Sequence, residues 1–196
     1  MKRNSIFIFS LVLTIISCTP HDITSSYVPV TNRTAEVHAY ECEDALGPLP
    51  RFSCADAIEV PTTKDGVPVT FPGGEEGSGS TDPSDCDLPW AFGMACQTGN
   101  RVGRYQGLNV DGSENTDVVF ITFCRDGGLG VIGYKFSTGE TCFFSIIDGA
   151  DSNNTPLPGE TGYNDSWMTP QVVADDRCMN CHMADPFLHT PAIDQL

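Results

Sequence analysis

Near the end of this 196-residue chain, positions 178–182 have the sequence CMNCH, which places reactive side chains close together. Two thiols stand three positions apart, an imidazole follows at once, and on a helical turn the three side chains share one face. From there Cys178 and Cys181 can form thioether bonds to the two vinyl groups of a porphyrin, while His182 binds the iron from one side. The alternatives are a disulfide between the two thiols and a zinc site. Zinc needs further ligands, usually a second CxxC or a histidine pair, and the sequence shows none in such a pattern.

The CxxCH run resembles the haem-attachment motif of c-type cytochromes, over little more than these five residues. The resemblance implies one covalent haem c as cofactor, attached to Cys178 and Cys181, with His182 as proximal iron ligand. In the familiar small cytochromes the motif lies near the N-terminus and a distal methionine follows much later. Here positions 183–196 are all that follow His182. That arrangement therefore does not apply, and the distal ligand stays open.

We expect His189 as the first choice of distal ligand, because Pro186 breaks the helix and the chain can then reach across a haem edge. Met168 is the second choice, and a five-coordinate iron the third. Two strong ligands leave no place for a substrate and make an electron carrier. An open position permits gas or peroxide chemistry instead, and axial ligand identity also sets the potential.

A short helix is predicted to present the motif. Thr169 can cap it and Pro170 is a favourable first residue, while Pro186 stops the chain from continuing as helix. We therefore assign residues 151–196 to a C-terminal haem-attachment segment with a short helical part.

Residues 1–17 have the features of a targeting segment rather than a folded element. Lys2 and Arg3 precede an apolar run at 6–16 that is too short to span a bilayer. The run IISC at 15–18 resembles the lipobox of bacterial lipoproteins, which implies cleavage before Cys18 and lipid attachment to its sulfur. The alternative is an ordinary secretory peptide with an incidental cysteine. The resemblance implies an exported protein held at a bacterial membrane by its lipid, facing the periplasm or the cell surface, with residues 18–36 as a polar tether.

The chain is strongly acidic, with 26 Asp and Glu against 10 Lys and Arg and a formal charge of −16. Removal of residues 1–17 takes away two basic residues and no acidic one, which leaves a net charge near −18. Such a surface repels nucleic acid, and we expect a redox partner protein to dock through a basic patch. The alternative is that the acidic surface serves solubility alone.

Nine cysteines divide into the lipid-bearing Cys18, the pair at 178 and 181, and six others. An even remainder in an exported chain predicts three disulfides. Strand geometry favours Cys96–Cys124 and Cys86–Cys142, which leaves Cys42 and Cys54 to close their own loop.

The fold class is predicted to be mainly β, a small disulfide-bonded antiparallel sheet or sandwich. Within residues 86–150, strands are expected at 101–106, 118–124, 131–136 and 141–147, separated by Gly-rich turns. Residues 37–60 are interpreted as a cysteine loop that holds His38 as a surface or half-buried side chain. Residues 61–85, rich in Gly, Ser and acidic residues, are interpreted as a linker, and Asp111–Asp117 as a hairpin loop rather than a calcium loop.

The sequence thus favours a lipid-anchored monohaem c-type cytochrome that passes single electrons and is not itself an enzyme. A haem enzyme or gas sensor with an open distal site is the first alternative. A haem-free, disulfide-stabilised surface lipoprotein that binds a partner is the second.

Overall fold

A computed structural model of the chain describes residues 33–72, 77–90, 95–125, 127–175, 182 and 185–196. The signal segment, Cys18 and the two cysteines of the CxxCH motif lie outside these residues. The central element is a five-stranded antiparallel sheet in the order β1-β6-β7-β8-β9. Its strands are β1 (Ile58–Glu59), β6 (Arg101–Leu108), β7 (Glu114–Arg125), β8 (Gly128–Lys135) and β9 (Thr141–Ser145).

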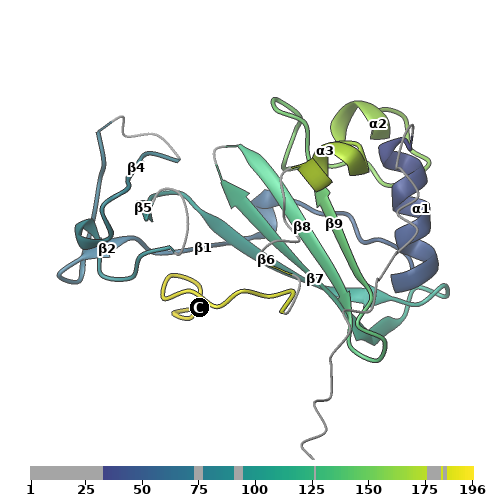
Figure 1. The fold of residues 1–196 in the computed structure, drawn as a ribbon, viewed down its shortest axis with the longest axis horizontal. Helices are drawn as coiled ribbons and strands as arrows, with labels where there is room; N and C mark the ends of the chain where they lie inside the picture. Colours follow the sequence, from purple (N-terminus) through teal and green to yellow (C-terminus); the bar gives the residue numbers. More distant parts are fainter. Residues whose placement is uncertain (1–32, 73–76, 91–94, 126, 176–181, 183–184) are drawn as a thin grey trace, which may run out of the picture.

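Strands β6 to β9 follow one another as a meander, and β1 joins the outer edge of β6 (Figure 1). The predicted antiparallel β fold is therefore confirmed, and the four expected strands are present with slightly different ends. The turn of β7 into β8 passes through Gly127, whose φ of 75° suits glycine. Among the described residues this is one layer of sheet covered by helices and loops, not a sandwich of two large sheets.

The first face of the sheet carries the main core. Residues of alternate positions in β7 point to it, from Val118 through Phe120 to Cys124, and are almost completely buried. Their neighbours in β8 and β9 continue the same face with Leu129, Val131 and Phe144.

Helix α1 (Ala35–Leu46) and the segment that follows it cover this face. Thr34 caps the helix, because its hydroxyl accepts a hydrogen bond from the Val37 N–H at 3.2 Å. The helix buries one stripe at helical spacing, which consists of Ala35, Ala39, Cys42 and Leu46. Residues 37–60 were expected to be a loop, and for residues 37–46 that prediction is wrong.

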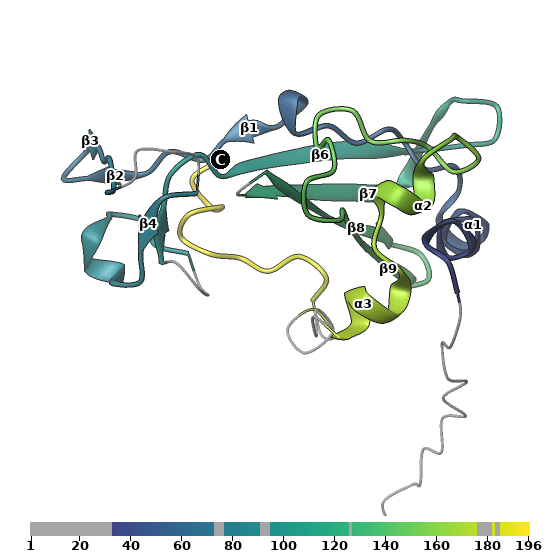
Figure 2. The same cartoon turned by 90° about the horizontal axis from the view of Figure 1, so that it is seen from above.

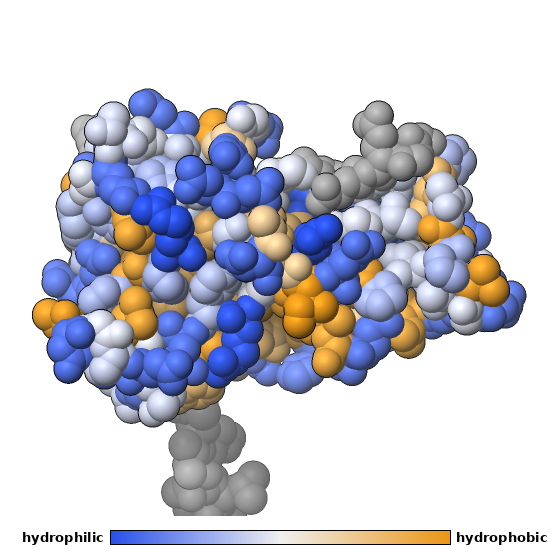
Figure 3. Space-filling model, turned by 180° about the vertical axis from the view of Figure 1, so that it is seen from behind, coloured by the Kyte–Doolittle hydropathy of each residue, from blue (hydrophilic) through white to orange (hydrophobic). Residues whose placement is uncertain are grey.

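After α1 the chain runs along the first face, through Phe52 to the 3₁₀ turn η1 (Cys54–Asp56). The Phe52 ring contacts those of Tyr105 at 5.3 Å, Phe120 at 5.5 Å and Trp167 at 6.2 Å. The backbone of this segment is fixed as well, because the Tyr105 hydroxyl accepts from the Ser53 N–H and donates to the Ser53 carbonyl, each at 2.9 Å. Figure 3 shows the molecule from this side, where most of the surface is hydrophilic and hydrophobic residues lie in small groups.

Three disulfides join the six cysteines, as predicted, but in different pairs. Cys42–Cys142 ties α1 to β9, Cys54–Cys124 ties η1 to β7, and Cys86–Cys96 closes a short loop. The predicted pairs Cys42–Cys54, Cys96–Cys124 and Cys86–Cys142 are therefore wrong. The reason is tertiary: the 35–57 segment lies across the sheet, so its two cysteines meet partners 100 and 70 residues away.

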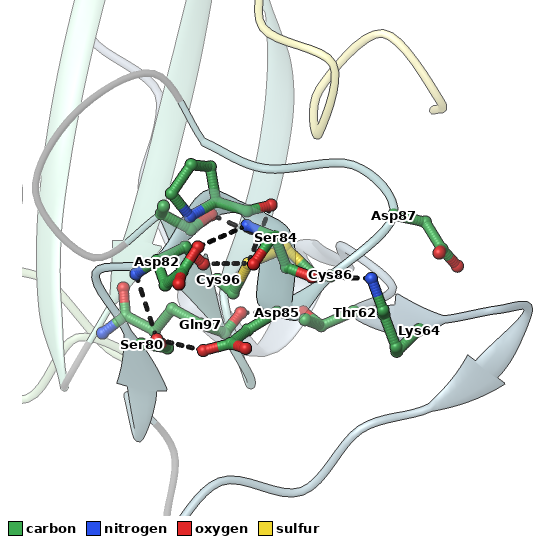
Figure 4. The surroundings of a disulfide bond; sticks show 12 residues. Thr62, Lys64, Ser80, Asp82, Ser84, Asp85, Cys86, Asp87, Cys96 and Gln97 are labelled. Carbon is green, nitrogen blue, oxygen red and sulfur yellow. Dashed lines mark hydrogen bonds between the residues drawn. A yellow bond between two sulfur atoms is a disulfide. The ribbon is translucent and has the colours of Figure 1, made fainter.

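A small lobe beyond the β1 end of the sheet contains the remaining strands. They are the short pairs β2 (Thr63–Lys64) with β3 (Val67–Pro68), and β4 (Gly79–Ser80) with β5 (Cys96–Gln97), beside the 3₁₀ turn η2 (Pro83–Asp85). Figure 4 shows the disulfide Cys86–Cys96 at the centre of this lobe. Residues 61–85 were interpreted as a linker, whereas their described part forms these short ladders.

The second face of the sheet is covered differently. Helices α2 (Tyr163–Ser166) and α3 (Pro170–Asp175) bring the chain past β9, and residues 185–196 then run along this face toward β1. Figure 2 shows the sheet between segment 47–57 on one side and the C-terminal segment, in yellow, on the other. The side chain of Gln195 donates a hydrogen bond to the Pro61 carbonyl at 3.2 Å, which places the end of the described chain beside the small lobe.

The long disulfide should contribute more to stability than the short one. Because Cys54–Cys124 lies inside the same stretch, Cys42–Cys142 closes a loop of about 30 residues, which is worth about 3.6 kcal/mol in the chain-entropy account, whereas Cys86–Cys96 closes about 10 residues and is worth about 2.7 kcal/mol. We expect the variant C42S/C142S to lose more unfolding free energy than the matched control C86S/C96S, as measured by urea titration. Equal losses would contradict the arrangement in which Cys42–Cys142 holds α1 on the sheet.

Candidate functional site

His182 is the residue of the CxxCH motif that the structure describes. It is half-buried, and its ring lies 5.9 Å from the ring of Phe143 in β9, measured between centroids. Its Nδ1 lies 2.7 Å from the Pro186 carbonyl oxygen. Cys178 and Cys181 lie outside the described residues.

The hydrogen bond to Pro186 fixes the tautomer of His182. A carbonyl oxygen can only accept a hydrogen bond, so Nδ1 of His182 carries the hydrogen and is the donor. In a neutral imidazole Nε2 then keeps its lone pair. A histidine that donates from one ring nitrogen to a backbone carbonyl is the usual form of a metal-binding histidine, because that bond orients the ring and raises the basicity of the other nitrogen. This hydrogen bond leaves Nε2 of His182 as the ring nitrogen with a free lone pair.

Helix α3 begins where the sequence predicts. Pro170 is its first residue, and the Val173 N–H donates to the Thr169 carbonyl at 3.1 Å. The helix packs on β9, and Val173 is buried there. The predicted continuation of this helix into the CxxCH motif falls on residues 176–181, outside those described.

A groove of about 120 Å³ lies between α1, β9 and α3. His38 lines it from α1, Phe143 from β9, and Val173 and Ala174 from α3. His38 is half-buried, as expected, and its Nε2 lies 3.1 Å from the Phe143 carbonyl, so Nε2 donates this bond. The ring also packs 5.3 Å from Phe144 and against the sulfur of Cys42. His38 therefore satisfies a carbonyl on the open edge of β9.

Burial lowers the pKa of His38 below its ordinary value of 6.5. The hydrogen bond to Phe143 and the nearby carboxylate of Glu41 act in the opposite direction, and Arg33 lowers the pKa further. Because desolvation is the largest of these effects, His38 is neutral at neutral pH.

The two predicted distal ligands lie in different settings. His189 is 77% exposed, and its Nδ1 is 2.9 Å from a carboxylate oxygen of Asp194, which raises the pKa of His189. Met168 is half-buried beside β9, where its N–H donates to the Ser145 carbonyl at 2.9 Å. The structure brings neither side chain into a described contact with His182, and the choice of distal ligand stays a prediction.

Phe143 is the site residue that sequence reasoning missed. Its carbonyl accepts from His38 and its ring contacts His182, so it connects α1, β9 and the CxxCH segment. Its position in the apolar alternation of the last strand was visible in the sequence. Its neighbours were not, because they come from residues 105 and 39 positions away.

The turn between β6 and β7 is shorter than expected. The carboxylate of Asp111 accepts from the Ser113 N–H at 3.0 Å and from its hydroxyl at 2.6 Å, and these bonds lower the pKa of Asp111. Strand β7 begins at Glu114, so residues 114–117, which were expected in the loop, belong to the strand. The expected hairpin loop is therefore present, but it covers residues 109–113.

Within the part of the chain that the structure describes, no group of three or more His, Cys, Asp or Glu side chains is arranged to hold a metal ion. Among the same residues, no helix is long and apolar enough to cross a bilayer. Comparison with protein-family models, with curated proteins and with solved structures found no match to this chain.

The buried state of His38 predicts a pH dependence of stability. Above pH 6.5 the imidazole is neutral in both the folded and the unfolded chain, so it has no effect there. As the pH falls below 6.5, the unfolded state takes up the proton more readily, and the free energy of unfolding decreases.

We expect His38→Asn to show a smaller decrease than the unchanged protein between pH 7.5 and pH 5.5, in urea titrations at each pH. Both proteins keep the His189–Asp194 pair, whose raised pKa acts in the opposite direction, so its contribution cancels in the difference. Identical pH profiles would show that His38 is solvated in the folded protein.

Proposed function

We propose that this chain is a lipid-anchored, monohaem c-type cytochrome that transfers single electrons. The observation that carries the proposal is the hydrogen bond from His182 Nδ1 to the Pro186 carbonyl at 2.7 Å. It leaves Nε2 as the nitrogen with a lone pair, directly after the two cysteines that the motif provides for thioether bonds.

The disulfides support this reading. Three disulfides persist in an oxidising compartment outside the cytoplasm, and that is also where c-type haem is attached. A chain with this cross-linking and a CxxCH run fits covalent haem better than a zinc site, for which the described residues offer no further ligand cluster.

The surroundings of His182 suit an electron carrier. The described neighbours of its ring are the Phe143 ring and a backbone carbonyl, which orient the imidazole. A bound haem supplies a reversible one-electron couple, whose potential depends on its axial ligands and on the polarity around it. Because His182 is half-buried, the site lies close to the surface, where a partner can approach.

The partner that fits is a protein with a basic docking patch. The charge of −16 favours encounter with positively charged surfaces and disfavours nucleic acid. A lipid on Cys18 would keep the protein at the membrane, with the predicted tether at 18–36 as the connection, although residues 35 and 36 already belong to α1. Both the anchor and the partner are proposals drawn from the sequence.

The test is a haemochrome spectrum of protein produced in a host that matures c-type cytochromes. We expect one haem per chain that stays with the polypeptide under denaturing conditions. C178A/C181A should lose it entirely, whereas the control His189→Ala should keep it, because His189 is not an attachment residue. Colourless protein in which Cys178 and Cys181 form a disulfide would refute the proposal and leave a haem-free binding lipoprotein.

A carbon monoxide titration of the reduced protein tests the carrier role. A strong second axial ligand fills the coordination sphere, so we expect binding that is slow or absent. His189→Ala should speed it and change the spin state if His189 is that ligand, and Met168→Ala should do so if Met168 is. Rapid binding to the unchanged protein would contradict the carrier role and favour an open distal site.

A further inference from the structure

The second face of the central sheet carries a row of apolar side chains that the core does not use. In the strand register Ile121 of β7 stands opposite Ile132 of β8, which stands opposite Phe143 of β9. Residues directly opposite each other share a face, so these three form one continuous row across the sheet. Each of the three is half-buried, in contrast to the first-face residues on either side of them, which are buried.

This row, called here the Ile121–Ile132–Phe143 row, ends at the motif. The Phe143 ring contacts His182 at 5.9 Å. A planar group coordinated by His182 would therefore begin beside Phe143.

Aromatic side chains stand at the borders of the row. Tyr134, one position along the same face of β8, contacts Phe187 of the C-terminal segment at 5.8 Å. Phe123, one position along the same face of β7, contacts Trp90 at 4.9 Å. The second face is thus apolar well beyond the row itself.

Gly130 has no side chain and therefore leaves space on the second face of the sheet. In the strand register Gly130 stands opposite Phe123 of β7 and opposite Ser145 of β9, two residues before Ile132 in β8. A Cβ at Gly130 would meet no heavy atom closer than the Phe123 carbonyl oxygen at 4.0 Å. Gly133, on the opposite face of the same strand, contrasts with it, because a Cβ there would come within 2.5 Å of the Phe120 ring. An added side chain would therefore find space at Gly130 on the second face but not at Gly133 on the first face.

We propose that the Ile121–Ile132–Phe143 row is the surface against which the porphyrin ring packs, with Gly130 leaving space beside it. This inference rests on the proposed function, since it concerns the same cofactor. A porphyrin is flat and apolar over its faces, and a sheet with branched aliphatic side chains offers a matching flat surface. Contact with this row would shield one side of the haem from water and so help to set its potential.

The direct test uses the unmutated, haem-loaded protein. Isoleucine methyl groups are labelled, and their NMR shifts are compared with those of the haem-free variant C178S/C181S. We expect the methyls of Ile121 and Ile132 to move strongly through the porphyrin ring current. Ile58 is the internal control: it is 65% exposed on β1, two strand spacings or about 10 Å beyond Ile121 of β7, and should move much less than Ile121 and Ile132.

A matched pair of substitutions gives a second measurement. Ile132→Ala should keep covalent haem but reduce the Soret circular dichroism and lower the midpoint potential, because water gains access to the ring. Ile58→Ala makes the same change on the same face at the opposite edge and should leave both values as they are.

Haem attached with unmoved Ile121 and Ile132 methyls, or equal effects of the two substitutions, would overturn the packing surface while the cytochrome assignment stands. Absence of covalent haem in the unchanged protein would overturn both.

Discussion

Two disulfides, Cys42–Cys142 and Cys54–Cys124, fasten the segment 35–57 to one face of the sheet, and the rest of the arrangement depends on this attachment. The four-stranded meander is local in sequence, but its first face would be open without that cover. Leu46 and Phe52 fill it, and each lies within a few residues of a cross-linked cysteine. The covalent bonds limit the entropy of an unfolded chain that otherwise brings together residues 100 positions apart.

Because segment 35–57 covers the first face, the second face of the sheet is the one that remains for contacts with the C-terminal segment. The C-terminal segment crosses that face, with Phe187 against Tyr134 and His182 against Phe143. Because both faces of the sheet are covered, much of strands β7 to β9 alternates between buried and half-buried residues, and not between buried and exposed ones. The first face stabilises the fold, and the second carries the proposed function.

Strand β9 links the two roles. On its inner positions Cys142 and Phe144 belong to the core, and on its outer positions Phe143 faces the motif. At its open edge, the imidazole of His38 and the Met168 N–H donate hydrogen bonds to the carbonyls of Phe143 and Ser145, which would otherwise face solvent. Helix α3 starts just beyond that edge, so the chain reaches the CxxCH motif from a rigid support.

Features that depend on neighbouring residues can be predicted from the amino-acid sequence. The strands of the meander follow from β-branched runs and Gly-rich turns, the start of α3 from Thr169 and Pro170, and the candidate chemistry from the CxxCH spacing. The helix at 35–46 has a sequence signal as well, because Ala35, Ala39, Cys42 and Leu46 recur at helical spacing.

The pairing of the cysteines and the neighbours of His182 follow instead from the three-dimensional arrangement of the elements. Both depend on where the chain lies after it crosses the sheet. Six cysteines allow fifteen pairings, and their spacing along the chain does not show which pairing forms. The contact between Phe143 and His182 joins two elements whose separation in sequence carries no signal of their approach. Local patterns fix backbone conformation over a few residues, whereas these contacts come from the packing of whole elements against one another.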